Sequence, residues 1–339
     1  MALDVLWYFV VIAALMFYAI LDGFDLGVGS LHLLARTDHE RRLFLNAIGP
    51  VWDGNEVWLV VISGALFAGF PEAFATIFSS FYEFSMLLVF GFIFRAVSIE
   101  FRSKHTSLRW RKSWDIAFCW ASILIAFGAG LVLGNLIEGI PLDGQKNFVG
   151  TLADFLRPYP ILFGITTVAL FSMHGAIYLV MKTEGSLQNH LKTWAQKCIQ
   201  IFIACYLLLT FATFYFAPYM TTHMRHYPVL FAIPLAALLA ILNIPRQMKK
   251  SSTGWAFISS CLSIVGLLSL FAIGSFPTLV RSSINPAENS VVIYNAASSE
   301  LTLKVLLTIV VIGIPLVLAY GTYIYRVFRG KVHLDDHSY

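Results

Sequence analysis

The sequence predicts an all-α polytopic membrane protein, and three observations support this fold class. Of the 339 residues, 58% are hydrophobic and only 12% are charged, whereas a soluble domain usually has about twice that charged fraction. Apolar runs of the length that crosses a bilayer as a helix, about 20 residues, recur along the whole chain. The basic residues fall in the loops between these runs and favour every second loop.

Nine apolar runs are interpreted as transmembrane helices. They cover residues 5–34, 54–70, 74–100, 114–136, 159–181, 197–217, 228–246, 254–275 and 303–327. No loop between them is long and polar enough to be a separate domain, so residues 1–339 are expected to form one integral membrane domain. A weak similarity between LDGFDLGVGSLHLL in the first run and FSMHGAIYLVMKTEG in the fifth suggests two four-helix sub-bundles, 1–136 and 159–275, with the last helix, 303–327, at their periphery.

The distribution of basic residues predicts the orientation. Seventeen of the 23 Lys and Arg residues lie in loops on one side of the membrane and five on the other. Because positively charged loops stay in the cytoplasm, the N-terminus is expected outside and the C-terminus in the cytoplasm. A signal peptide normally has Lys or Arg before its apolar segment, but none precedes the first apolar run here. The first helix is therefore expected to be retained. The net charge of +4 is small, and no nucleic-acid partner is expected.

Two acidic residues in the first predicted helix are the most informative feature. Asp22 and Asp25 lie three positions apart and so share one face of a helix. A charge near the bilayer centre costs about 3 kcal/mol or more, which makes two such residues a functional hypothesis by default. Ten further residues, mostly apolar, follow before Arg36, which favours a position within the inner half of the membrane. Gly23 and Gly27 form a G-x-x-x-G pattern that would let another helix approach closely.

Two more acids, Asp53 and Glu56, begin the second predicted helix in the string GPVWDGNEVW. Acids in a first turn complement the helix dipole, and Asp53 is a reasonable N-cap, so both have a structural interpretation. The alternative is a functional one, favoured for Asp53 by the polar and aromatic residues around it. A short connection to the first helix would place all four acids at the cytoplasmic side.

Three other polar residues fall inside predicted helices. Glu83 is expected near the middle of the third, and Arg95 lies twelve residues further on, too far for a pair along one helix, so each needs a partner elsewhere. His174 could ligate haem, but no second His or Met stands at a paired position, and a hydrogen-bonding role is favoured. The four cysteines form no Cys-x-x-Cys pair, so neither a metal site nor a disulfide framework is indicated.

Several segments together resemble the subunit II family of cytochrome bd quinol oxidases, including its cyanide-insensitive type. They are LDGFDLGVG, IGPVWDGNEVWLV, SGALFAGFPEAFA, FRAVSIEFRSK, WRKSWD, GNLIEGIP, HGAIYLVMKTEG, VIYNAASSELTLK and AYGTYIYRVFRGKV. They extend from the first predicted helix to the last, and GPVWDGNEVWLV is the most specific of them.

This resemblance implies nine transmembrane helices in the bacterial cytoplasmic (inner) membrane. It implies a complex that oxidises ubiquinol or menaquinol, reduces O₂ to water and takes up protons from the cytoplasm. In the family, subunit I holds haem b and haem d and binds the quinol, so no cofactor is assigned to this chain. Small accessory subunits and a structural quinone occur in some members.

The resemblance also assigns roles to acids. The acid of the family's Gly-Phe-Asp motif falls on Asp25 and that of its Trp-Asp/Glu motif on Asp53, which implies that both belong to a proton route. The assignment extends less directly to Asp22 and Glu56. Asn295 stands where the family commonly has Asp, so an acidic role at that position is not expected.

Two other classes compete with this interpretation. Acids within the membrane would also suit a proton-coupled secondary transporter, although the interior prolines Pro234 and Pro315 are not next to an acid. A structural scaffold, whose acids only pair with a partner subunit, is the other.

Overall fold

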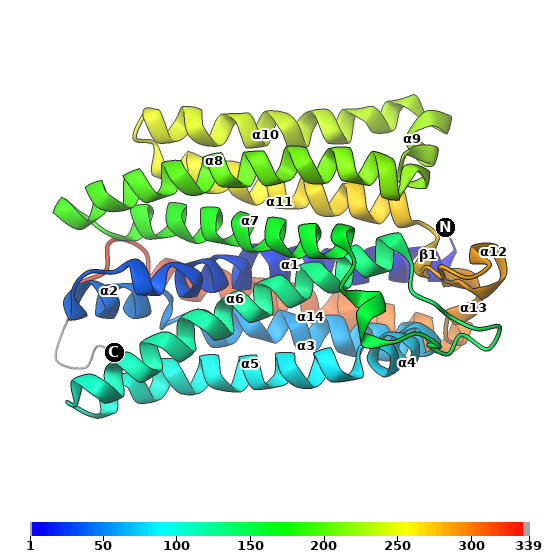
Figure 1. Ribbon diagram of the computed structural model, residues 1–339, viewed down its shortest axis with the longest axis horizontal. Coiled ribbons are helices and arrows are strands. Elements are labelled where there is room, and N and C mark those ends of the chain that lie inside the picture. The colour runs from blue at the N-terminus through cyan, green and yellow to red at the C-terminus, as the bar shows by residue number, and fades with distance from the viewer. Residues whose placement is uncertain (1, 335–339) are drawn as a thin grey trace.

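The computed structural model describes residues 2–334. Long helices run nearly parallel to one another and make up most of the molecule (Figure 1). They are α1 (Leu3–Leu31), α3 (Trp52–Gly69), α5 (Tyr82–Phe101), α6 (Leu108–Glu138), α7 (Pro158–Lys182), α8 (Gly185–Phe216), α10 (Ala232–Lys249), α11 (Thr253–Ser275) and α14 (Glu300–Val327).

Short elements connect the long helices. They are η1 (His32–Leu34), α2 (Asp38–Ile48), α4 (Pro71–Ser80), η2 (Arg102–Lys104), η3 (Leu152–Phe155), η4 (Pro218–Thr221), α9 (Thr222–His226), η5 (Pro228–Phe231), α12 (Pro286–Asn289) and α13 (Ile293–Ala296). Strands β1 (Thr278–Val280) and β2 (Val291–Val292) pair antiparallel in the connection before α14. This small sheet lies at the opposite end of the molecule from α2 (Figure 1).

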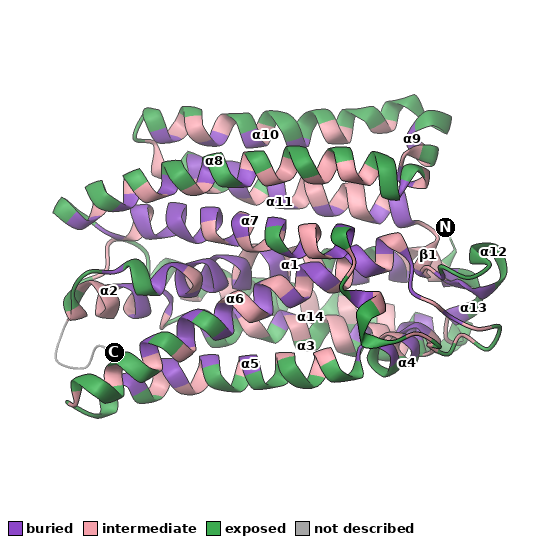
Figure 2. Cartoon of the chain, in the orientation of Figure 1, coloured by how far each residue is buried: buried purple, intermediate pink, exposed green. Residues whose placement is uncertain are grey.

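Helices α1 and α7 form the centre of the molecule. α1 packs against α3, α6, α7 and α11, and α7 packs in addition against α6 and α8. Helix α10 packs on α11, and α14 lies against α1 and α3. Burial follows this order, because the central helices are largely buried whereas the outer faces of α5, α8 and α10 are exposed (Figure 2). The many exposed apolar side chains on those outer faces are those expected of a surface that faces lipid.

Two glycines let α1 and α7 cross in backbone contact. A Cβ atom on Gly27 would lie 1.9 Å from the carbonyl oxygen of Phe171, and one on Gly175 would lie 2.5 Å from the carbonyl carbon of Gly27. The predicted close approach of another helix at Gly27 is therefore confirmed, and the partner is α7.

Eight helices of the described chain are long and apolar enough to cross a membrane. Helix α3, which covers the second predicted crossing, is not one of the eight. Its first turns contain Asp53, Asn55 and Glu56, which lower its mean hydropathy. The structure thus shows a helical protein of the polytopic membrane class, and the ninth crossing stays a prediction.

The predicted helix over 74–100 is wrong in its details. The chain forms two helices there, α4 and α5, because Phe81 leaves the helical conformation between them (φ −95°, ψ 29°). Glu83 consequently lies exposed in the first turn of α5 and not in the middle of a helix. Both flanking segments are apolar, so hydropathy alone does not reveal the break.

Helix α2 lies in what the sequence suggested was a short loop. The side chain of Thr37 caps it by accepting a hydrogen bond from the backbone N–H of Glu40 (3.1 Å). Its apolar face, with Phe44, Leu45 and Ile48, is buried against the main core. The helix therefore covers the end of the bundle at which α1 finishes.

Candidate functional site: carboxyl groups buried between α1, α3 and α5

An arginine from α5 binds a carboxylate from α1 inside the bundle. Arg95 donates from Nη1 to Oδ2 of Asp22 (3.0 Å) and from Nη2 to Oδ1, so the contact is bidentate. Both side chains are 0% exposed. The expectation that Arg95 needs a partner on another helix is confirmed, and the partner lies 73 residues away in sequence.

Glu56 of α3 shares the same guanidinium. Its Oε2 atom lies 3.4 Å from Nη1 of Arg95, and its side chain is 23% exposed. Arg95 therefore ties α1, α3 and α5 together. It is a single cation between two carboxyl groups, so it cannot also neutralise Asp25, the third acid of this region.

Asp25 is held by an amide and not by a cation. Its Oδ2 atom accepts a hydrogen bond from Nδ2 of Asn55 (2.7 Å), and the side chain is 0% exposed. Its Oδ1 atom has no hydrogen-bond partner in the described part of the chain. Asn55 in turn accepts a hydrogen bond from the hydroxyl of Tyr325 (2.8 Å), which links α1 through α3 to α14. A buried carboxyl oxygen of this kind is available to carry or release a proton.

Asp53 lies apart from this cluster. It is exposed, and within residues 2–334 it forms no hydrogen bond or ion pair. The N-cap interpretation is also wrong, because Val51 is the N-cap of α3 and Asp53 lies in the first turn. Helix α3 turns Asn55 towards α1, which leaves Asp53 on a different face, one turn before Glu56. The four predicted site residues thus separate into three that meet around Arg95 and Asn55 and one at the surface.

Asp25, Asn55 and Tyr325 form a chain of hydrogen bonds, and a cavity of about 270 Å³ lies beside Tyr325 at the end of this chain. Tyr178 and Tyr325 line it together with Lys182, Arg329 and Lys331, and its lining contains no acidic side chain. Lys331 donates to the carbonyl oxygens of Met181 and Thr183 (2.8 Å each), which fixes the segment after α14 to the end of α7. Partial burial lowers the pKa of the Lys331 ammonium. The cavity therefore opens beside Tyr325 at a positively charged end of the bundle.

A second buried network lies near η1 and α2, and the sequence analysis missed it. Asp115 of α6 accepts from Nε of Arg102 (2.5 Å) and lies 2.6 Å from Nε2 of His32. Arg102 also donates to Asp38 (2.7 Å), as does Arg111 (3.0 Å). The sequence did contain one indication of this network, because Asp115, the acid of WRKSWD, lies in the first turns of a predicted apolar helix. These contacts join the ends of α1, α2, α5 and α6, which is a structural role.

His174 is already engaged within the protein. It is fully buried, its Nδ1 atom lies 2.7 Å from Oγ of Ser260, and its Nε2 atom lies 3.0 Å from the carbonyl oxygen of Ile20. Its interpretation as a hydrogen-bonding residue is confirmed, and haem ligation would require the loss of one of these contacts. Among residues 2–334, no group of three or more His, Cys, Asp or Glu side chains is placed to hold a metal ion.

Comparison with known proteins identifies the family. Residues 3–328 match the family model described as cytochrome bd terminal oxidase subunit II. The chain is 32% identical to cytochrome bd-I ubiquinol oxidase subunit 2 of Escherichia coli strain K12, with 98% of this chain and 95% of that protein aligned. It is also 32% identical to cytochrome bd ubiquinol oxidase subunit 2 of Bacillus subtilis strain 168, with 98% of each chain aligned.

A solved structure supports the same assignment at the level of the fold. A chain in the structure of bd oxidase from Geobacillus thermodenitrificans superposes with a TM-score of 0.80 at 16% identity, covering 97% of this chain and 99% of that chain. The resemblance seen in the sequence is confirmed, and a secondary transporter is not favoured. The chain belongs to the cytochrome bd terminal oxidase subunit II family.

Proposed function

We propose that this chain is the second subunit of a quinol:O₂ oxidoreductase in the bacterial cytoplasmic membrane. The similarity over nearly the whole length to proteins named ubiquinol oxidase subunit 2 supports this proposal. Haem b and haem d, and the quinol site, are assigned to a partner subunit I, with small accessory subunits as further partners. The two protein contacts of His174 agree with this division. We assign neither a haem nor a structural quinone to this chain.

We further propose nine crossings, with the N-terminus outside and the C-terminus in the cytoplasm. Helix α3 has 18 residues, which corresponds to about 27 Å at 1.5 Å per residue, close to the hydrocarbon thickness of about 30 Å. The bias of basic residues supports the orientation. On this proposal residues 1–339 are one membrane domain in which 1–136 and 159–275 form two sub-bundles.

The partner subunit is proposed to cover the exposed face of α3. Asp53 is exposed on this helix together with the large apolar side chains Val57, Val60 and Phe67. An acid directed into lipid would be costly, whereas an acid at a subunit interface can meet water and polar partners. The exposure of Asp53 beside these apolar side chains therefore supports α3 as the face that contacts the partner subunit.

Within this complex, we propose that the chain provides a route for proton uptake from the cytoplasm. Asp53 is the entry group at the surface, Glu56 follows one turn later, and Asp25 is the buried group that holds the proton. Asp22 is neutralised by Arg95 and sets the local charge. The observation that carries the proposal is the Oδ1 atom of Asp25, which is buried without a hydrogen-bond partner in the described chain.

The geometry explains why Asp25 suits this role better than Asp22. An ionised Asp25 leaves a buried acceptor unsatisfied, which costs about 1–3 kcal/mol, whereas a protonated one does not carry a buried negative charge. Asp22 differs from Asp25 in this respect, because its two oxygens both accept hydrogen bonds from Arg95. Asn55 cannot ionise, and it holds the Asp25 carboxyl in place.

The test compares Asp25→Asn and Asp53→Asn in the intact complex, with Glu83→Gln as a matched control at an exposed acid outside the cluster. We expect both Asn variants to assemble with the full haem spectrum and to consume O₂ at least about tenfold more slowly, because a positioned proton-transferring group typically contributes about 10²–10⁴-fold to a rate. The control should retain the wild-type rate. Wild-type turnover of Asp25→Asn and Asp53→Asn would refute the route. Reduced assembly with normal turnover per haem would favour the structural scaffold.

A further inference from the structure

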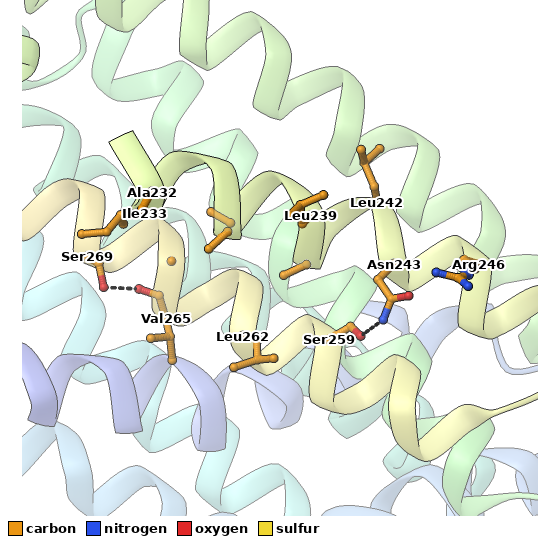
Figure 3. Close-up of a pocket in the computed structure, with 14 residues that line it drawn as sticks. Ala232, Ile233, Leu239, Leu242, Asn243, Arg246, Ser259, Leu262, Val265 and Ser269 are labelled. Carbon is orange, nitrogen blue, oxygen red and sulfur yellow. Dashed lines mark hydrogen bonds between the residues drawn. The ribbon is translucent and has the colours of Figure 1, made fainter. Parts of the chain in front are cut away.

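The surface between α10 and α11 contains a groove of about 900 Å³ that the proposed function does not use (Figure 3). Small side chains create it, because Ala236 and Ala240 of α10 and Gly266 of α11 leave space between the larger residues on either side. The two helices touch at its floor, where a Cβ atom on Gly266 would lie 2.6 Å from that of Ala237. The groove is therefore open only to the outside of the bundle.

The groove has the dimensions of a hydrocarbon chain. Its lining extends along α10 from Ala232 to Arg246, a distance of about 21 Å at 1.5 Å per residue. Dividing the volume of about 900 Å³ by this length gives a mean cross-section of roughly 43 Å². A helix with its side chains is about 10–12 Å across and would need roughly twice that area. A flexible acyl chain fits the space, and a further transmembrane helix does not.

The polar groups of the groove lie towards one end. Nδ2 of Asn243 donates to Oγ of Ser259 (2.8 Å), and Oδ1 of Asn243 accepts from Gln247 (3.2 Å). Arg246, one turn beyond Asn243, lies at the end of the groove (Figure 3). Arg246 is exposed and forms no ion pair with any residue from 2 to 334. The remainder of the lining is apolar apart from Ser269, whose hydroxyl donates to the carbonyl oxygen of Val265 (2.7 Å).

The charged residues around the Arg246 end of the groove are all basic. Between Glu184 and Glu288 the sequence contains no acidic residue, so α8, α10 and α11 have none. Lys249 and Lys250 follow Arg246 directly. A guanidinium without an acidic partner, at the mouth of an apolar groove, is suited to a phosphate group. Basic pockets between transmembrane helices on the cytoplasmic side are recognised sites for anionic headgroups.

We propose that the α10–α11 groove binds one anionic phospholipid, with an acyl chain along Ala236, Ala240 and Gly266 and the phosphate at Arg246. Asn243, one turn deeper, lies at the level of the glycerol esters of such a lipid. The acyl chain would fill the groove, and the phosphate would neutralise part of the positive charge of Arg246, Lys249 and Lys250. This binding is independent of the proton route and of the acids around Arg95.

The experiment uses the whole complex in vesicles that contain a trace of phosphatidylglycerol with a photoreactive acyl chain. After illumination, peptides carrying the lipid are identified by mass spectrometry. We expect the peptides of α10 and α11 to be labelled several-fold more than those of α8, whose outer face is also apolar and exposed and which contributes no residue to the groove. The same experiment with photoreactive phosphatidylcholine should label α10 and α11 less.

Variants separate the headgroup from the groove. Arg246→Gln should lower phosphatidylglycerol labelling of α10 and α11 about fivefold, the effect of one basic charge near the membrane surface, with little change for phosphatidylcholine. Ala240→Leu should lower labelling by both lipids. Lys197→Gln and Ala204→Leu, at exposed positions of α8, are the matched controls and should change neither.

Equal labelling of α8 and of α10–α11, or insensitivity to Arg246→Gln, would overturn the proposal in favour of ordinary surrounding lipid. Lipid label that is absent from α10 and α11 but present on another polypeptide of the complex would overturn it in favour of a protein partner. The visible haem spectrum of each variant reports assembly separately, so a failure of the proton route would not affect the outcome. If Ala240→Leu does not assemble, the surface variant Arg246→Gln decides the question alone.

Discussion

Arg95 is the residue on which the buried acid cluster depends most directly. Its guanidinium binds Asp22 in two places and also reaches Glu56. A buried ion pair of this kind adds little net stability, but removing one partner leaves an uncompensated charge. The same argument is the reason that we propose Asp25, which is held by an amide and not by a cation, as the acid that exchanges a proton.

Arg95→Gln should therefore destabilise the protein by about 3–5 kcal/mol, because the Asp22 carboxylate stays buried without its cation. The measurement is the temperature at which the purified complex loses its haem absorbance. The double variant Asp22→Asn/Arg95→Gln removes both charges and should recover most of this loss. If the double variant lost as much stability as Asp22→Asn and Arg95→Gln lose together, the ion pair between these residues would not be the cause.

Two kinds of contact join the helices: a close backbone crossing at glycines in the middle of the bundle and a network of ion pairs at one end. At the crossing, Gly27 and Gly175 allow the backbones of α1 and α7 to touch. At the end, Asp115 connects α6 to Arg102, which follows α5, and to His32, which follows α1. Each of these contacts can be tested by substitutions that leave the acids around Arg95 unchanged.

Gly175→Ala should push α1 and α7 apart, because its Cβ atom would lie 2.5 Å from backbone atoms of Gly27 that cannot move aside. We expect a loss of about 1–3 kcal/mol, typical of overpacking, seen as a lower temperature of haem loss. Gly313→Ala is the matched control, because no atom lies within 4 Å of its added Cβ. That variant should be neutral or slightly stabilising, since Ala is a better helix former than Gly.

Asp115→Asn should loosen the junction of α1, α2, α5 and α6. It removes the charge that Arg102 and His32 share, at a cost of about 3–5 kcal/mol for a broken buried pair. Hydrogen exchange should rise in α2 and in the last turns of α5 before it rises in α7. Uniform exchange across the chain would instead show that the network does not hold these particular elements.

At the scale of the whole molecule, the arrangement of crossings decides which end meets the cytoplasm. Helix α2, whose Asp38 is joined through Arg102 to Asp115, lies at one end of the bundle, and the small sheet lies at the other end (Figure 1). The basic loops are assigned to the end that contains α2. A proton route from the cytoplasm requires the basic end to face inwards. Orientation is therefore a direct test of the proposed topology.

In a chain whose four cysteines are replaced by Ala, single cysteines at Ser251 and Gln145 should lie on opposite sides. An impermeant thiol reagent should label Gln145→Cys in intact spheroplasts, and Ser251→Cys only after permeabilisation. Both residues are in loops between helices, so neither substitution should disturb packing. The reverse pattern would invert the proposed orientation, and labelling of both in intact cells would refute the number of crossings between them.

The sequence by itself determined the class of the protein, the approximate place of its helices, the family, and the close approach at Gly27. These follow from hydropathy, from residue spacing along one helix and from motifs, all of which are local properties. The sequence also showed that Arg95 needed a partner on another helix. It did not show which helix, because Asp22 lies 73 residues away.

Only the tertiary structure decided how the acids divide between the interior and the surface. Asp25 is buried and accepts a hydrogen bond from an amide of α3, whereas Asp53 is exposed, although the sequence predicts both as acids within transmembrane helices or at their start. The break at Phe81 and the network around Asp115 also emerged only in three dimensions. The physical reason is that contacts between helices depend on how each helix is rotated and how it crosses its neighbours, and those angles are fixed by packing along the whole bundle.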